Sequence, residues 1–174
     1  MTWHYEIMGS PIGDIHLIAE GEALCALEFE GYEKRMRQFL KRRFGRVEIE
    51  AGPVPAATRD SVEAYFAGDF SALDRIPTKT GGTEFQERVW QALRAIPCGE
   101  TTTYGAIAKR IGAPGASRAV GLANGSNSIA LVIPCHRVIG ADGSLTGFGG
   151  GLERKQWLLA HEGVAPQGQG ELGL

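Results

Sequence analysis

The apolar residues of this chain follow two kinds of spacing, and the order of these spacings limits the folds open to it. In residues 12–20 and 23–30, apolar and polar residues alternate, which predicts two β-strands. From residue 83 onward, the apolar positions follow a helical spacing instead. Residues 68–82, between the two patterns, are rich in turn-forming residues and are the predicted domain boundary. A chain of 174 residues is long enough for one large domain or for two small ones.

The first part of the chain also contains helical patterns. Residues 32–45 predict a basic helix with Met36, Phe39 and Leu40 on one side. Residues 59–67 predict a second helix, after a short strand and a loop broken by proline. A nucleic-acid contact would explain the basic run, but composition favours a solvated helix face.

The second part begins with the signature of a helix N-terminus. Thr83 and Gln86 have the spacing of a capping box. Residues at i, i+4, i+8 and i+11 then form one apolar stripe, namely Phe85, Val89, Leu93 and Ile96. The proline and glycine of the IPCG segment that follows end this helix.

Two shorter predicted helices are joined by a glycine-containing turn, as in a helix-turn-helix. The first spans residues 101–112, and the second begins at Ser117, a candidate N-cap, and ends near Gly125. The second helix is rich in small residues and carries Arg118 in its first turn. Such a helix can approach a nucleic acid backbone closely, because its N-terminus favours phosphate. Tight packing on neighbouring helices explains the small residues equally well, so both interpretations stay open.

The charge of the chain limits the classes of partner that it is expected to bind. A net charge of −2 argues against strong, sequence-blind attraction to DNA or to anionic membranes. Residues 1–84 hold 10 Lys+Arg and 14 Asp+Glu (10 − 14 = −4), whereas residues 85–174 hold 8 and 6 (8 − 6 = +2). An anionic partner is therefore expected to bind the second part.

The cysteines and the apolar runs indicate a cellular location. Cys25, Cys98 and Cys135 lack a CxxC spacing and are typical neither of a disulfide framework nor of a zinc site. No signal peptide is visible, and no apolar run is long enough to span a bilayer. We therefore expect a cytoplasmic protein with free thiols and no membrane association.

A glycine-rich loop, residues 140–151, precedes the last predicted helix. Its glycines match neither GxGxxG nor a phosphate loop, so no nucleotide cofactor is expected. Its backbone N–H groups are free to meet a flat ligand instead. The helix that follows ends at Gly163, and the residues expected to face inward are Leu152, Trp157, Leu158 and Leu159.

The segment LVIPCHRVIG, residues 131–140, places a thiol, an imidazole and a guanidinium inside an apolar run. A cysteine in such a run is usually inert packing, but a neighbouring histidine can favour the reactive thiolate. Adjacent strand residues point in opposite directions, so His136 can activate Cys135 only across a turn or through water. Pro134 favours such a turn, and Glu162, at the end of the last helix, is a carboxylate that could orient His136.

The IPCHRVIG segment, with SRAVGLANGSN before it and GGGLERKQWLLAHEG after it, resembles the O6-alkylguanine-DNA alkyltransferases, also called methylated-DNA–protein-cysteine methyltransferases. The similarity runs from residue 83 to residue 163 in the family's order and spacing, and PCHRV is its most specific part. The first part of the chain resembles the family only loosely, through SPIGDIHLIAEGEALCALEF. The overall form is similar to that of the short bacterial members.

The resemblance implies an α+β fold of two domains. Residues 1–80 would form an N-terminal ribonuclease-H-like α/β domain. Residues 83–165 would form a helical C-terminal domain with a winged helix-turn-helix, which carries out alkyl transfer and DNA binding. Residues 166–174 are expected to be a disordered tail, and the protein is expected to be a monomer. Some family members hold a structural zinc ion, but Cys25 lacks Cys and His partners at suitable spacing, so no metal is expected.

The resemblance also implies a reaction on double-stranded DNA. The protein would flip O6-alkylguanine, with O4-alkylthymine as a second candidate substrate, out of the duplex. Cys135 would take the alkyl group in an SN2 displacement and keep it, so that each molecule acts once. His136, linked to Cys135 through water and directly to Glu162, would generate the thiolate. No cofactor would be needed.

Further residues would support this reaction. Asn127 would brace the active-site segment, Tyr104 would rotate the nucleotide and donate to the base, and Arg118 would fill the gap left in the base stack. The edge of the guanine would be bound by backbone groups of Cys135, Val138 and Gly149.

The chain departs from the residue pattern of the family at two positions, and three other classes of protein are alternatives to the resemblance. Ser128 stands where the family commonly has proline, and Phe148 stands where tyrosine is common, so the bracing turn would be softer and one hydroxyl near the pocket would be missing.

A non-catalytic DNA-damage-binding protein of the same fold would lack the cysteine. A Cys-His hydrolase would turn over repeatedly. A helix-turn-helix regulator would bind a defined sequence without being modified.

Overall fold

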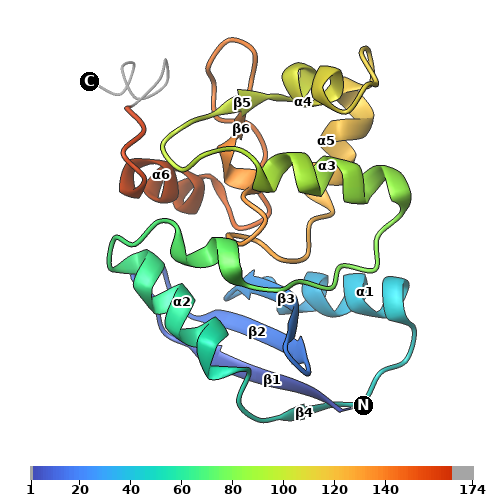
Figure 1. Ribbon diagram of the computed structural model, residues 1–174, viewed down its shortest axis with the longest axis vertical. Helices are drawn as coiled ribbons and strands as arrows, with labels where there is room; N and C mark the ends of the chain where they lie inside the picture. Colours follow the sequence, from blue (N-terminus) through green and yellow to red (C-terminus); the bar gives the residue numbers. More distant parts are fainter. Residues whose placement is uncertain (1, 166–174) are drawn as a thin grey trace. The chain divides into compact units, whose positions relative to one another are not determined.

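Figure 1 shows the computed structural model, which describes residues 2–165. The predicted tail at residues 166–174 lies outside the described residues. One compact unit comprises Met1–Gly82 and Ser128–Val132, and the other comprises Thr83–Asn127 and Ile133–Leu174. The main division, after Gly82, falls at the end of the turn-rich segment in which the sequence places the domain boundary.

The first unit is built on a four-stranded sheet of order β3-β2-β1-β4. Strands β1 (Trp3–Met8) and β2 (Ile15–Glu20) are antiparallel, as are β2 and β3 (Ala23–Phe29), whereas β4 (Ile49–Ala51) runs parallel to β1. The alternating pattern predicts β2 and β3, and both are confirmed. Every residue of β2 before Glu20 is buried, so this strand is covered on both faces.

Two helices and a 3-10 turn complete the first unit. Helix α1 (Glu33–Phe44) buries Met36 and Leu40 in the apolar cluster of the sheet, as expected. Phe39, expected beside them, is half-buried and lies between two arginine guanidinium groups of the same helix, 4.9 and 5.1 Å from its ring centre. Helix α2 (Ala56–Phe66) begins earlier than residue 59, where the sequence places its start. The 3-10 turn is η1, Ala72–Arg75.

The segment Ser128–Val132 belongs to the first unit, although the sequence places it in the C-terminal domain. The Leu27 N–H donates to the Ser128 carbonyl across 2.9 Å, and the Ala130 N–H donates to the Leu27 carbonyl across 3.1 Å. The side chain of Arg43 donates to the Ser128 hydroxyl across 2.8 Å. Ser128, the first of the two departures named above, is therefore held by a side-chain hydrogen bond.

Up to residue 165, the second unit contains four α-helices, a 3-10 turn and a small parallel sheet. Helix α3 (Glu84–Arg94) has the predicted capping box, with the Gln86 N–H donating to Thr83 Oγ1 and the Gln86 side chain accepting from the Thr83 N–H. The other elements are α4 (Tyr104–Arg110), α5 (Ser117–Gly125), η2 (Cys135–Arg137), α6 (Leu152–His161), β5 (Thr102–Thr103) and β6 (Val138–Ile139).

Helices α4 and α5 form the predicted helix-turn-helix pair (Figure 1). Ser117 is not the N-cap of α5; Ala116 takes that position and makes no side-chain cap bond. The inner face of α5 is fixed in part by the Trp90 indole, which donates to the Ala123 carbonyl across 2.9 Å. The outer face presents Arg118 and Leu122 to solvent, Leu122 with 73% of its surface exposed. Of the small residues of this helix, Ala123 is buried, Gly121 is partly buried and Ala119 is exposed, so tight packing accounts for only part of them.

Within residues 2–165, no helix combines the length and the apolar character that a membrane crossing requires.

Candidate active site

Cys135 opens the 3-10 turn η2 at the end of a buried apolar run. Pro134 has φ −80° and ψ 67°, and the Cys135 N–H donates to the Ile133 carbonyl across 2.7 Å. These are the features of an inverse γ-turn. The turn that the sequence suggests at Pro134 is therefore present, and Cys135 lies just below the surface, 6% exposed.

Asn127 is attached to the same turn. Its side-chain Nδ2 donates to the Ile133 carbonyl across 2.8 Å, in a buried contact. That carbonyl also accepts from the backbone of Cys135. The contact that a bracing role for Asn127 requires is thus found in the structure.

His136 and Glu162 meet inside the second unit. Nε2 of His136 lies 2.7 Å from Oε2 of Glu162, and both side chains are fully buried. Glu162 is the C-cap of α6, and this position brings its carboxylate to η2. Among the described residues, His136 Nδ1 has no hydrogen-bond partner. An imidazole that donates from Nε2 to the carboxylate presents its Nδ1 lone pair as a proton acceptor.

Arg137 holds the other side of the same carboxylate. Its Nε donates to Glu162 Oε1 across 2.8 Å, and its Nη2 donates to Oε2 across 3.2 Å. Its Nη1 donates to the Ile96 carbonyl across 2.7 Å. Bidentate pairs of this kind fix the orientation of both groups, so Arg137 restrains the Glu162 carboxylate.

The protonation states follow from these contacts. Burial opposes ionisation of Glu162, but the hydrogen bonds and charges of His136 and Arg137 outweigh it and hold the pKa of this carboxyl well below its usual range. Burial lowers the pKa of His136, despite the opposing influence of Glu162. At neutral pH the pair therefore consists of a carboxylate and a neutral imidazole.

Lys155 is a further buried charge at this site, and the sequence analysis did not identify it. Its side chain is fully buried, and Nζ donates to the carbonyls of Val138 and Thr146, each across 2.6 Å. Burial lowers the pKa of Lys155 to about 8, and the charge of Cys135 acts in the opposite direction. A cation close enough to interact with Cys135 favours its thiolate form.

Helical spacing could have revealed Lys155. Two of the four residues expected to face inward from α6 do not, because Leu152 is 46% exposed and Trp157 is only half-buried. The buried face of this helix and its cap runs at i, i+3, i+4 and i+7 through Lys155, Leu158, Leu159 and Glu162. Hydrophobicity alone therefore predicted the wrong buried face for α6, because two of the four residues on that face are charged.

The glycine-rich loop borders the same site. The Tyr104 hydroxyl lies 3.0 Å from the Thr146 hydroxyl, and the Phe148 ring meets the His136 ring edge to face, with centres 6.5 Å apart. Gly149 follows Phe148 and is partly exposed. The structure thus gathers Tyr104, this loop and η2 around one site.

Val138 and Arg118, two further predicted site residues, differ in their surroundings. Val138 lies in β6, where its carbonyl accepts from Lys155. Arg118 is exposed in the first turn of α5 and lies outside the buried cluster of Cys135, His136 and Glu162.

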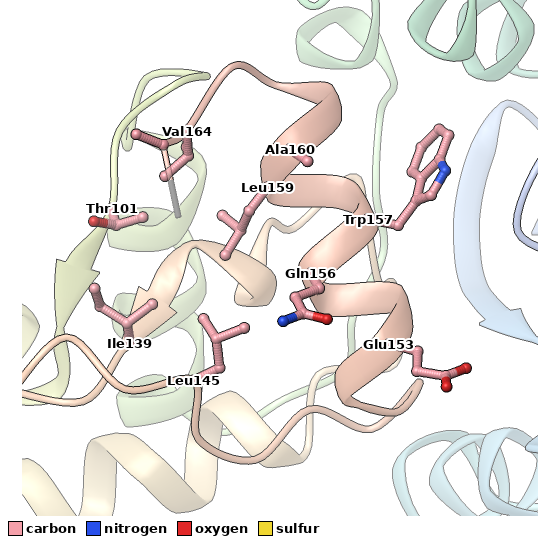
Figure 2. A pocket seen from close by; sticks show the side chains of 10 residues that line it. Thr101, Ile139, Leu145, Glu153, Gln156, Trp157, Leu159, Ala160 and Val164 are labelled. Atoms are coloured by element: carbon pink, nitrogen blue, oxygen red, sulfur yellow. The ribbon is translucent and has the colours of Figure 1, made fainter. Parts of the chain in front are cut away.

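A separate hollow beside α6, about 410 Å³ in volume, is shown in Figure 2. Its apolar lining includes Ile139, Leu145 and Leu159, whereas the Trp157 side chain points away from them. None of the predicted site residues lines it. The hollow is therefore distinct from the cysteine site.

A metal site in a protein needs several His, Cys, Asp or Glu side chains close together. Residues 2–165 contain no group of three or more His, Cys, Asp or Glu side chains arranged to hold a metal ion.

Comparisons with known proteins first define the class of protein, which consists of a ribonuclease-like domain and a DNA-binding domain. Residues 3–80 match the ribonuclease-like domain of the 6-O-methylguanine DNA methyltransferases, and residues 84–164 match the DNA-binding domain of the same proteins. The predicted α+β fold of two domains is thereby confirmed. The chain belongs to the 6-O-methylguanine DNA methyltransferase family.

Individual relatives agree over nearly the whole chain. The methylated-DNA–protein-cysteine methyltransferase of Mycolicibacterium paratuberculosis is 63% identical over 163 residues, covering 91% of each chain. That of Shigella flexneri is 49% identical over 162 residues, covering 91% of this chain and 94% of the relative. Among solved structures, the Mycobacterium tuberculosis O6-methylguanine methyltransferase is 45% identical with a TM-score of 0.77, covering 94% of this chain and 95% of that one. Mycobacterium tuberculosis OGT in complex with DNA is 44% identical with a TM-score of 0.78, covering 93% and 92%.

Proposed function

We propose that this protein repairs DNA by direct reversal: it transfers the alkyl group of O6-alkylguanine in duplex DNA to its own Cys135, once per molecule. The observation that carries the proposal is the buried His136–Glu162 pair next to Cys135, with Nδ1 of His136 left available as a proton acceptor. Membership of the family supplies the reaction class. None of the cysteines in residues 2–165 forms a disulfide, and a reducing cytoplasm is the proposed location.

The first step is formation of the Cys135 thiolate. His136 Nδ1 accepts the thiol proton, through water, and the resulting imidazolium is stabilised by the Glu162 carboxylate 2.7 Å from Nε2. Glu162 stays ionised because its pKa is held low, and Arg137 keeps it in place. The Lys155 ammonium adds positive charge close to the sulfur. The thiolate, rather than the thiol, is the nucleophile.

The second step is displacement at carbon. The Cys135 sulfur attacks the alkyl carbon, a sulfur–carbon bond forms, and the bond between that carbon and O6 breaks. The guanine takes the electron pair of the broken bond and, overall, the proton that the thiol has lost. The product thioether has no free thiolate to react again, so the protein acts stoichiometrically.

The substrate reaches this buried sulfur only outside the base stack. Arg118, exposed at the start of α5, is proposed to enter the gap that the flipped nucleotide leaves. Tyr104, at the start of α4, is proposed to rotate the nucleotide and to donate to the base. Backbone groups of Cys135, Val138 and Gly149 are proposed to bind the guanine edge. O4-alkylthymine is a second candidate substrate, and the working form is proposed to be a monomer without cofactor or metal.

A turnover experiment tests the proposal. A duplex with one O6-methylguanine is mixed in excess with the protein, and repaired strands are counted over time. The expected result is a plateau at one repaired duplex per protein molecule, and no repair by Cys135→Ala at equal DNA binding. Repair that continues well past one equivalent points to the rival Cys-His hydrolase and rejects the proposal.

A further inference from the structure

The stretch of chain that leads into the active-site turn, residues 128–132, belongs to the first unit and is buried throughout. Leu27, in β3, pairs with Ile129 as a parallel β-bridge. The Leu27 N–H donates to the Ser128 carbonyl across 2.9 Å, and the Leu27 carbonyl accepts from the Ala130 N–H across 3.1 Å. The backbone contacts of a single β3 residue therefore fix the path of this stretch over its first three residues.

A side chain from α1 secures the beginning of the same stretch. Nη1 of Arg43 donates to the Ser128 hydroxyl across 2.8 Å, and Ser128 is 3% exposed. The Arg43 guanidinium lies 4.9 Å from the centre of the Phe39 ring, so its own position is restrained. A hydrogen bond from a charged donor is stronger than one between neutral groups, and its loss inside a protein leaves a polar group without a partner. The Arg43–Ser128 bond is therefore a stabilising anchor for the start of the stretch.

The far end of the stretch contains a strained residue. Among residues 2–165, Leu131 is the only non-glycine residue with a positive φ, which is +73°. The Val132 N–H donates to the Ala130 carbonyl across 2.8 Å, so Leu131 is the centre of a γ-turn of the rare kind with positive φ. A residue keeps such a conformation only where the surrounding structure imposes it. Leu131 is therefore a point at which the chain relaxes if its surroundings loosen.

The two ends of the stretch are bonded to residues of the active site. Ser128 follows Asn127, and Val132 precedes Ile133. The Ile133 carbonyl accepts from Asn127 Nδ2 across 2.8 Å and from the Cys135 N–H across 2.7 Å. A change in the path of this stretch thus moves both the brace and the carbonyl that fix the Cys135 turn.

We propose that Arg43 is a positioning residue for alkyl transfer: its hydrogen bond to Ser128 keeps the strained stretch 128–132 on the path that places Cys135 for reaction. The inference rests on the proposed function. Arg43 belongs to the first unit and acts on the reaction only through Ser128.

Loss of the anchor changes the reactivity of the sulfur in one direction. Leu131 relaxes toward a negative φ, and the turn that carries Cys135 is displaced. His136 lies in the same 3-10 turn, so its contact with the Glu162 carboxylate is disturbed as well. The Cys135 thiolate then forms less readily, and both alkyl transfer and the reaction with simple alkylating reagents become slower.

The test compares variants of the two bonded residues in two reactions of Cys135. Arg43→Ala and Ser128→Ala each remove one partner of the bond, the double variant removes both, and Arg43→Lys keeps a charged donor. Methyl transfer from a saturating O6-methylguanine duplex is measured in a single turnover, and alkylation of Cys135 by iodoacetamide is followed by peptide mass spectrometry. Arg42→Ala, which removes an exposed arginine of the same helix, is the matched control.

The expected result is a loss of rate that Arg43 and Ser128 share. Arg43→Ala should slow both reactions roughly three- to tenfold, the change expected for one hydrogen bond. Ser128→Ala should slow them by a similar factor, and the double variant should be no slower than either single variant, because the two residues act as one unit. Arg43→Lys should recover most of the parent rate, and Arg42→Ala should not change it.

Two results would overturn the inference. One is a parent-like rate per folded molecule in Arg43→Ala, even where its melting temperature falls, because this indicates a role in stability alone. The other is a double variant slowed by the product of the two single factors, which would show that Arg43 does not act through Ser128. Ser128→Ala leaves α1 intact, so it decides the question if Arg43→Ala does not fold. The iodoacetamide reaction needs no DNA, so a parent protein that is alkylated at Cys135 but takes no methyl group rejects the proposed function while Arg43 is still tested.

Discussion

Nε2 of His136 lies 2.7 Å from Oε2 of Glu162 although 26 positions separate the two residues in the chain. Neither side chain is exposed to solvent. An ion or a polar group without such a partner would be costly to bury, so each residue makes the burial of the other tolerable. The same contact leaves Nδ1 of the imidazole as the proton acceptor of the site.

Replacing Glu162 by Gln should slow alkyl transfer without a comparable loss of DNA affinity. A neutral amide cannot stabilise the imidazolium that forms when Cys135 loses its proton, and we expect a decrease of roughly 10- to 100-fold at neutral pH. Binding should persist because the carboxylate contacts His136 and Arg137, in the protein interior. Single-turnover rates and fluorescence anisotropy on one protein preparation separate the two properties. Equal rates in mutant and parent across the neutral range would remove Glu162 from the mechanism.

Lys155→Met should move the pH–rate profile to higher pH. In the parent, the Lys155 ammonium, whose pKa is about 8, favours the Cys135 thiolate at neutral pH. Without this charge the thiolate forms at higher pH, so the variant should be slower at pH 7 and should approach the parent rate as the pH rises. A variant whose profile coincides with that of the parent would show that Lys155 does not act on Cys135.

The same substitution should alter the pH dependence of stability. The pKa of Lys155 is about 8 in the folded protein and about 10.4 for an unperturbed lysine. Between these values Lys155 binds more protons in the unfolded chain than in the folded one, so the stability of the parent should rise with pH relative to that of Lys155→Met. Denaturant titrations of parent and Lys155→Met at several pH values in this window measure the difference. Parallel curves for the two proteins would contradict the lowered pKa.

Arg118→Ala should separate DNA handling from chemistry. Flipping a base costs a few kcal/mol of lost stacking and pairing, and an inserted side chain offsets part of that cost. Loss of Arg118 should slow repair of duplex DNA by roughly 10- to 100-fold, or about 1.4 to 2.8 kcal/mol of barrier. O6-benzylguanine as a free base needs no flipping, so its reaction should barely change if it fits the pocket. Equal slowing of both reactions in a well-folded variant would mean that Arg118 supports the pocket itself.

Chelating agents should leave the rate of alkyl transfer unchanged. The sequence offers Cys25 no suitable metal-binding partners, and no metal-binding cluster is found in residues 2–165. The rate is measured before and after dialysis against a chelator. A loss of activity that zinc restores would reveal a metal site.

Local patterns predicted much of the secondary structure, and they failed where tertiary contacts decide. The capping box of Thr83 and Gln86 is visible in the sequence because it is complete within four residues. Strand β1 (Trp3–Met8) was missed, although its apolar residues also alternate. The assignment of Ser128–Val132 to the first unit depends on backbone pairing with Leu27, for which an apolar run gives no signal.

The residues of the candidate site also divide into those that a local pattern reveals and those that depend on tertiary contacts. The PCHRV motif indicated Cys135 and His136, and the turn at Pro134 could be inferred from proline geometry. Lys155 could not be identified by hydrophobicity, because its burial depends on two backbone carbonyls that the chain brings to it from β6 and the glycine-rich loop.

Mass spectrometry after a single reaction tests the central claim most directly. The intact protein is mixed with an O6-methylguanine duplex, weighed, and then digested to locate any modification, with Cys135→Ser treated in parallel. We predict one added methyl group per chain, located on Cys135, and none on the variant. A methyl group on Cys25 or Cys98, or repaired DNA with an unmodified protein, would contradict irreversible transfer to Cys135.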